Sequence, residues 1–267
     1  MDVTSTMLSV DQAAALLRTA VETGTPIAPL RDRLETPDAA TAYAIQEANT
    51  RHWIENGRHL VGRKIGATSK AVQNLLGLAQ PDYGMLFADM AFADGETIPV
   101  SRVSQPKVEG EIAFFLGDDL DNDHLTLADV MHSIEYAVAA IEVVGSRIAD
   151  WNIKIVDTVA DNASSGLYVL GSQPRPLSAF DPVLCGMVMS CRGEPMATGA
   201  GVACLGNPLV ATLWLAKKMA EVGRPLKKGD TILSGALGPL VPVAGGDVVE
   251  LRISGLGTVR CRFEGEA

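Results

Sequence analysis

Two glutamates spaced two residues apart give the sequence its clearest chemical signal. Glu109 and Glu111 lie in residues 107–116, a run that otherwise has the apolar composition of a buried strand. Side chains alternate along a strand, so both carboxylates point to the same face. A second apolar run, residues 136–144, carries the single carboxylate of Glu142 and no basic residue. The pattern predicts three carboxylates that converge in the interior.

Carboxylates in such a place need a cation or a proton, because an unpaired buried charge is costly. Three of them together fit a hard divalent ion such as Mg²⁺ or Mn²⁺. The alternative is that Glu109 and Glu111 line the solvated face of an ordinary strand while Glu142 pairs with a distant lysine or arginine. Spacing alone does not separate these two interpretations.

The composition indicates one large globular domain, or one domain with a helical appendage. The chain has 267 residues, of which 47% are hydrophobic, and a formal net charge of −10 with no cluster of basic residues. An acidic surface repels nucleic acid and anionic membrane, so we expect neither as a partner. No apolar run is long enough to span a bilayer and the start has no secretory signal, from which we expect a cytoplasmic protein. The four cysteines lack a C-x-x-C spacing, which indicates reduced structural thiols.

The first part of the chain has the pattern of two helices. Residues 9–12 have the form of a capping box, and the apolar periodicity that follows stops at Gly24. A second helix is predicted over residues 39–56, with a proline in the usual place near its start. We expect residues 1–58 to form an N-terminal helical cap and residues 59–267 to form one continuous catalytic body.

Three short segments of the body offer further polar groups. Lys64 is bracketed by apolar residues and glycines in a predicted strand, although a strand lysine commonly extends to solvent. Asp82 lies in the predicted turn 80–84, where it could serve only as a turn former. The polar loop 160–166, which holds Ser164 and Ser165, interrupts two apolar runs and is a suitable place for ligand contacts.

The C-terminal half alternates short strands with glycine-rich turns. A hairpin is predicted around residues 192–194, and one helix is predicted between Pro208 and Gly223. Many short strands with such turns predict an α+β fold with a mixed, largely antiparallel body.

Several motifs together resemble the 2-keto-4-pentenoate hydratases of the fumarylacetoacetate hydrolase superfamily. They follow one another along nearly the whole chain: VGRKIG (61–66), QPDYG (80–84), KVEGEIAF (107–114), EVVGSRI (142–148), DTVADNASS (157–165), LGNP (205–208) and SGALGP (234–239). The resemblance implies a mixed β-roll of the fumarylacetoacetate hydrolase C-terminal type. It also implies an Mg²⁺ or Mn²⁺ site and a role in the meta-cleavage degradation of aromatic compounds.

With this resemblance, each candidate residue receives an expected role. Glu109, Glu111 and Glu142 hold the ion, and a small anionic substrate, 2-hydroxypenta-2,4-dienoate, chelates it. The expected roles of the other side chains are a cation for substrate charge at Lys64, a proton shuttle at Asp82, orientation of substrate or water at Ser164 and Ser165, and a structural role at Asp161. We expect a homo-oligomer, and a complex with a decarboxylase of the same pathway stays open.

Three alternatives remain at this stage. The 4-oxalocrotonate decarboxylases share the E-x-E strand and the polar loop. They tend to have Met after the strand lysine and to lack the Gln-Pro-Asp turn, whereas this chain has Ile65 after that lysine and the Gln-Pro-Asp turn at residues 80–82. A hydrolase of the superfamily would use a His-Glu pair, and none of the four histidines lies beside a matching motif. A metal-stabilised binding protein without catalysis is the third alternative, against which the presence of Lys64 and Asp82 argues.

Overall fold

The computed structural model describes residues 7–76, 79–122 and 124–265. Its α-helices are α1 (Val10–Thr23), α2 (Ala39–Glu55), α3 (Lys70–Leu76), α4 (Leu127–Ser133), α5 (Ile155–Ala160) and α6 (Pro208–Glu221). Its strands are β1 (Leu60–Gly66), β2 (Asp82–Phe87), β3 (Ala91–Ala93), β4 (Thr97–Ile98), β5 (Lys107–Leu116), β6 (Ile134–Val144), β7 (Leu167–Leu170), β8 (Gly186–Cys191), β9 (Glu194–Ala200), β10 (Thr231–Leu233), β11 (Val241–Pro242), β12 (Val248–Ile253) and β13 (Gly257–Phe263).

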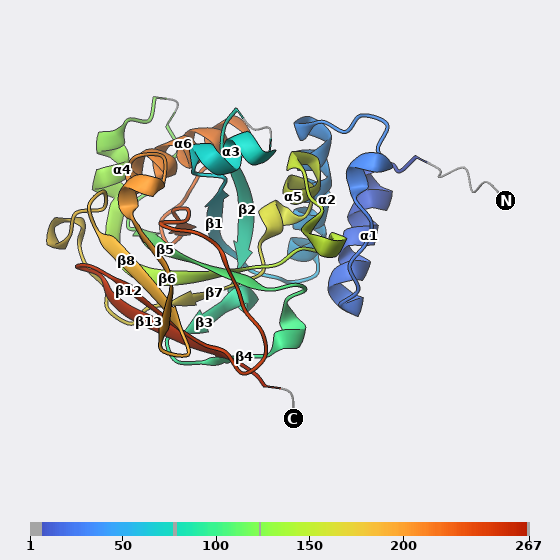
Figure 1. The fold of residues 1–267 in the computed structure, drawn as a ribbon. Helices are drawn as coiled ribbons and strands as arrows, with labels where there is room; N and C mark the ends of the chain where they lie inside the picture. Colours follow the sequence, from blue (N-terminus) through green and yellow to red (C-terminus); the bar gives the residue numbers. More distant parts are fainter. Residues whose placement is uncertain (1–6, 77–78, 123, 266–267) are drawn as a thin grey trace.

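The strands form two sheets that pack against each other (Figure 1). The larger sheet has eight strands in the order β2-β1-β10-β5-β6-β7-β3, with β11 paired to β5, and the smaller has the order β4-β13-β12-β8-β9. Most described pairs are antiparallel, and the parallel ones are β1 with β10, β3 with β7 and β4 with β13. The predicted α+β fold with a largely antiparallel body is confirmed.

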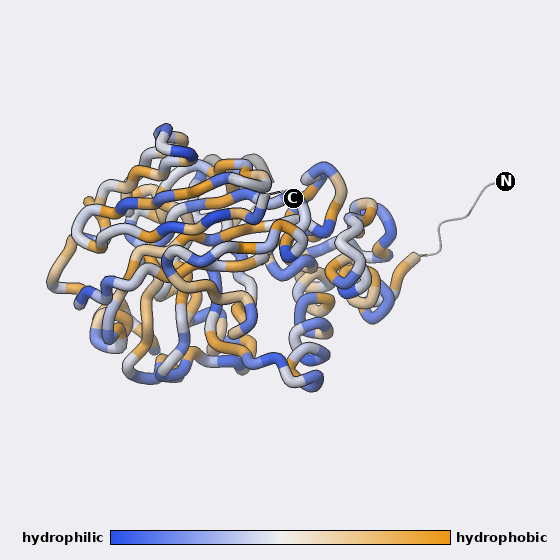
Figure 2. Tube along the Cα trace, turned by 90° about the horizontal axis from the view of Figure 1, so that it is seen from below, coloured by the Kyte–Doolittle hydropathy of each residue, from blue (hydrophilic) through white to orange (hydrophobic). Residues whose placement is uncertain are grey.

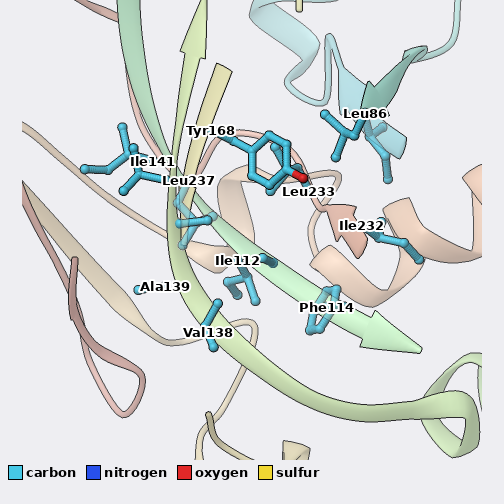
Figure 3. Packing of buried hydrophobic residues seen from close by; sticks show 14 of the residues in the cluster. Leu86, Ile112, Phe114, Val138, Ala139, Ile141, Tyr168, Ile232, Leu233 and Leu237 are labelled. Atoms are coloured by element: carbon cyan, nitrogen blue, oxygen red, sulfur yellow. The ribbon is translucent and has the colours of Figure 1, made fainter. Parts of the chain in front are cut away.

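Strand β5 lies in the middle of the larger sheet, and its two faces have different surroundings. One face packs on the smaller sheet so closely that a Cβ added at Gly110 would lie 2.6 Å from Leu251 and 2.9 Å from Met187. Ile112 and Phe114 alternate with the glutamates and are fully buried in the core (Figure 3). The other face carries Glu109 and Glu111, which therefore point away from the smaller sheet.

The smaller sheet has one buried face and one face open to solvent. Along β12 and β13 the buried residues alternate with exposed or half-buried ones. In Figure 2, which views the molecule from below, hydrophobic and hydrophilic stretches alternate along the chain. This is the pattern of an antiparallel sheet that covers a core on one side.

The N-terminal helices pack on each other and on α5, a helix that is distant in sequence (Figure 1). Their shared hydrophobic cluster contains Leu17 of α1, Ile45 of α2 and Val159 of α5. Helix α1 starts at Ser9 with the predicted capping box and ends at Gly24, whose φ is +65°. The division into a cap of residues 1–58 and a body of residues 59–267 stays a prediction.

The predicted helices and strands are confirmed with small shifts of their ends, apart from one segment. Residues 82–84 of the predicted turn begin strand β2, where Asp82 pairs with Gly66 and Gly84 with Lys64. Pairing with β1 outweighs the local preference of these residues for a turn. Within the described ranges, no helix combines the length and the apolar composition that crossing a bilayer requires.

Candidate metal centre and active site

The three glutamates come together through the pairing of β5 with β6. Glu109 lies directly opposite Glu142 in this antiparallel pair, and Glu111 is two residues further along the same face of β5. One carboxylate oxygen from each glutamate lies within 4.8 Å of the corresponding oxygen of the other two. The convergence predicted from the two apolar runs is therefore present.

Burial makes this cluster unfavourable without a cation. Glu111 and Glu142 have no exposed surface, which excludes the solvated-face interpretation for Glu111, and Glu109 is half-buried. Burial raises the pKa of Glu109 to about 8, with a contribution from the charge of Glu142. Burial also raises the pKa of Glu111 well above its usual value, and both neighbouring glutamates add to this effect. A cluster of carboxylate oxygens with unpartnered lone pairs fits a hard divalent cation.

Lys64 forms an ion pair with one glutamate of this cluster. Its Nζ lies 3.2 Å from Oε1 of Glu142, and both side chains are almost completely buried. Burial acts to lower the pKa of Lys64, but the surrounding carboxylates, Glu142 first, outweigh it and raise the pKa. Lys64 is therefore an ammonium, and the alternative in which it extends to solvent is wrong. Glu142 does pair with a distant lysine, and that lysine is itself one of the candidate residues.

Asp82 lies beside Lys64 at the point where β2 begins. A Cβ added at Gly66 would contact the carboxylate of Asp82 and would lie 3.4 Å from Nζ of Lys64, so both groups meet over this glycine. Asp82 is buried and its Oδ1 has no hydrogen-bond partner. Burial raises the pKa of Asp82, and Lys64 opposes that shift. A carboxyl group whose pKa is raised toward neutral pH is suited to proton transfer.

The polar loop is held in a backbone conformation that few residues adopt. Asn162, Ala163 and Ser164, the residues of the 3₁₀ helix η5 (Asn162–Ser164), all have φ between 52° and 55°. The side chain of Asn162 bonds both backbone groups of Met85, accepting from its N–H at 2.7 Å and donating to its carbonyl at 2.9 Å. These bonds fix the loop on β2, and left-handed backbone of this kind is often found at functional sites.

The two candidate serines have different surroundings. Oγ of Ser164 shares a hydrogen bond of 2.9 Å with Oγ1 of Thr158, whereas Oγ of Ser165 is buried without a partner. Ser165 also lines a cavity of about 320 Å³ beside Trp53 and Arg147, to which none of the three glutamates contributes. The role of both serines in orienting substrate or water stays a prediction.

Arg147 fixes the loop from the other side, a role that the sequence motif did not reveal. Its guanidinium forms an ion pair with Asp161 and donates to the carbonyls of Asp161 at 2.7 Å and Ser165 at 2.9 Å. The backbone N–H of Arg147 donates to the same carboxylate at 2.9 Å. These contacts give Asp161 the structural role expected for it.

Comparison with known proteins shows which family this chain belongs to. The model of the fumarylacetoacetate hydrolase C-terminal domain matches residues 43–264. The chain belongs to the fumarylacetoacetate hydrolase family. It is 60% identical to the TodF product hydratase of Pseudomonas putida, over 96% of this chain and 95% of that protein. It is 57% identical to the 2-keto-4-pentenoate hydratase of Paraburkholderia xenovorans, over 95% of this chain and 94% of that protein.

A solved structure of the same family has nearly the same fold. The 4-oxalocrotonate decarboxylase of Pseudomonas putida G7, complexed with magnesium and adipate, superposes with a TM-score of 0.91. It is 33% identical to this chain and the match covers 97% of this chain and 99% of that one. The resemblance to the hydratases, and the β-roll that it implied, are confirmed.

Proposed function

We propose that this protein is a divalent-metal-dependent hydratase that converts 2-hydroxypenta-2,4-dienoate to 4-hydroxy-2-oxopentanoate in the meta-cleavage degradation of aromatic compounds. The observation that carries the proposal is the buried set of three glutamates with Lys64 paired to one of them. The hydratase relatives, which are 57–60% identical over nearly the whole chain, support the reaction class.

The proposed roles of the side chains follow from their places in the site. Glu109, Glu111 and Glu142 would hold Mg²⁺ or Mn²⁺, which would supply Lewis-acid chemistry to the bound substrate. Lys64 supplies a fixed ammonium in a dry site, where it stabilises the negative charge that develops on the 2-oxygen more strongly than it could in water. The overall acidic protein thereby provides one local cation for an anionic substrate.

Proton transfer is assigned to Asp82. Ketonisation moves the enol proton to carbon 5 and gives 2-oxopent-3-enoate, whose double bond is electrophilic at carbon 4. Water adds its oxygen to carbon 4 and a proton is delivered to carbon 3, so the net change is addition of one water. Asp82 is a suitable carrier because burial raises the pKa of its carboxyl, which allows it to hold a proton and to release it again. Ser164 and Ser165 orient the substrate or the water.

A decarboxylase acting on 4-oxalocrotonate is the second candidate, favoured by the fold shared with the decarboxylase of Pseudomonas putida G7. Two observations favour the hydratase over it. The identity to hydratases is 57–60%, against 33% for the decarboxylase. The chain also has the Gln-Pro-Asp segment at residues 80–82, which brings Asp82 beside Lys64.

The test is a spectrophotometric assay with both substrates. We expect the ultraviolet absorption of 2-hydroxypentadienoate to disappear only when protein and Mg²⁺ or Mn²⁺ are both present, and negligible release of CO₂ from 4-oxalocrotonate. A Glu111→Gln variant serves as the control without an intact metal site and should be inactive. Rapid release of CO₂ would reverse the choice of reaction, and full activity in the presence of EDTA would contradict the metal site.

Sedimentation analysis of the same sample tests the expected homo-oligomer, and adding the pathway decarboxylase tests a complex.

A further inference from the structure

The backbone bends directly after β10, and this bend reaches the glutamate cluster. Ser234 continues the strand pairing by donating its N–H to the carbonyl of Ile112 at 3.0 Å. The next N–H, that of Gly235, leaves the sheet pattern and donates to Oε2 of Glu111 at 2.8 Å. The other oxygen of the same carboxylate, Oε1 of Glu111, is buried and has no hydrogen-bond partner among the described residues.

Position 235 favours glycine for two independent reasons. Its φ is +107°, a region that side-chain-bearing residues rarely occupy. A Cβ added there would lie 2.6 Å from Oγ1 and 3.0 Å from Cβ of Thr68, and closer still to Cγ2 of Thr68. Any other residue must therefore move the bend away from Thr68, and the N–H moves with it.

Neighbouring contacts hold both sides of this bend in place. The thiol of Cys204 donates to the carbonyl of Ser234 at 2.9 Å. The carbonyl of Thr68 accepts the N–H of Leu205 at 2.9 Å, and Thr68 is itself buried. Because Cys204 and Leu205 are adjacent in the chain, one segment holds Ser234 and Thr68 together, and neither can give way alone.

We propose that Gly235 is a positioning residue for the metal site: its N–H fixes one oxygen of Glu111 and thereby leaves the other oriented as a ligand. A hydrogen bond from a neutral donor to a carboxylate is stronger than one between neutral groups, and it restricts the rotation of the carboxylate about its terminal bond. The groups behind metal ligands commonly set metal affinity in this way. This inference rests on the proposed metal site.

The experiment is a calorimetric titration of the metal-free protein with Mn²⁺. The variants are Gly235→Ala and a matched control, Gly95→Ala. Gly95 also has a positive φ, +86°, and its N–H also donates at 2.8 Å, to the carbonyl of Arg260, but nothing lies within 4 Å of an added Cβ. We expect Mn²⁺ affinity to fall roughly tenfold or more in Gly235→Ala, as for loss of a hydrogen bond to a charged group, and to stay within about twofold of wild type in Gly95→Ala.

Two further measurements separate positioning from general loss of structure. Thr68→Ala removes the nearest obstructing atoms, so Thr68→Ala combined with Gly235→Ala should recover part of the lost affinity. Thermal unfolding with and without Mn²⁺ gives the stabilisation that the metal contributes, which should shrink in Gly235→Ala by more than in Gly95→Ala. A folded Gly235→Ala protein that binds Mn²⁺ as tightly as wild type would overturn the inference.

The Cys204 variants decide the question if Gly235→Ala does not fold. Cys204→Ala removes the donor that holds the Ser234 carbonyl, whereas Cys204→Ser keeps a donor. We expect weaker Mn²⁺ binding in Cys204→Ala than in Cys204→Ser, and equal affinities in both variants and wild type would overturn the inference. Failure of the wild-type protein itself to bind Mn²⁺ would instead overturn the proposed metal site.

Discussion

Replacing Lys64 by methionine should destabilise the metal-free protein in a pH-dependent way. The ammonium of Lys64 lies 3.2 Å from Glu142, and both side chains are almost completely buried. Methionine keeps most of the volume of the side chain but removes the charge, which leaves Glu142 buried among two other carboxylates. Removing one partner of a buried ion pair typically costs about 3–5 kcal/mol.

Protonation sets an upper limit on this loss. A glutamate that loses its cation can take up a proton instead of remaining charged. Each pH unit above about 4.3, the pKa of a glutamate in an unfolded chain, makes proton uptake about 1.4 kcal/mol more costly. The ceiling is therefore about 4 kcal/mol at pH 7 and about 1 kcal/mol at pH 5.

Urea denaturation in EDTA at both pH values measures the effect. We expect Lys64→Met to lose about 3–4 kcal/mol of unfolding free energy at pH 7 and about 1 kcal/mol at pH 5, and adding Glu142→Gln to recover most of the loss at pH 7. Lys107→Met is the matched control, because Lys107 lies on the same strand face as the glutamates but stacks on Trp151, 4.1 Å from the ring centroid. Its loss should be about 1 kcal/mol and independent of pH. Equal losses at pH 5 and pH 7 in Lys64→Met would refute the view that Lys64 balances glutamate charge.

Three further predictions follow from the same geometry. In EDTA, the unfolding free energy of the wild type should fall as pH rises from about 4.3 to about 8 and then level off. Folding raises the pKa of Glu109 to about 8, so the unfolded state releases that proton first. Urea denaturation across this range should show a shallower dependence of the unfolding free energy on pH in Glu109→Gln. Asp161→Asn leaves the buried guanidinium of Arg147 without its carboxylate and should cost about 3–5 kcal/mol by urea denaturation, whereas Asp119→Asn, which alters an exposed pair, should leave the unfolding free energy nearly unchanged. With saturating Mg²⁺, Lys64→Met should lose about 2–4 kcal/mol of transition-state stabilisation, mainly in kcat. Lys64→Arg should also have a low kcat, because a planar guanidinium does not replace a compact ammonium. Near-normal turnover in both variants would remove Lys64 from the mechanism.

The glutamate cluster could be predicted from the sequence because its geometry is local to one pair of strands. The period of two in β5 places Glu109 and Glu111 on one face whatever the rest of the fold does. A single carboxylate in a second apolar strand then needs only that the two strands pair. The two N-terminal helices could be predicted for a similar reason, since their capping residues and periodicity are local.

The identity of Lys64 as the partner of Glu142 could not be predicted, because it depends on strand order. Strand β1 is separated from β6 by β10 and β5 in the sheet, and β10 enters from the C-terminal part of the chain. The role of Gly235 has the same origin. Its glycine could be read from the sequence, but neither its positive φ nor the side chain of Thr68 beside it could.

The charge of the assembled site explains why a divalent ion suits it. Three carboxylates and one ammonium, all at least half-buried, leave a formal charge of −2. Asp82 adds little to this charge when it holds its proton, which its raised pKa favours. A divalent cation makes the site neutral, whereas without Lys64 the same ion would leave one uncompensated buried carboxylate. Lys64 therefore has a structural task before any substrate arrives, and its loss should affect the metal-free protein and the turnover number through the same charge.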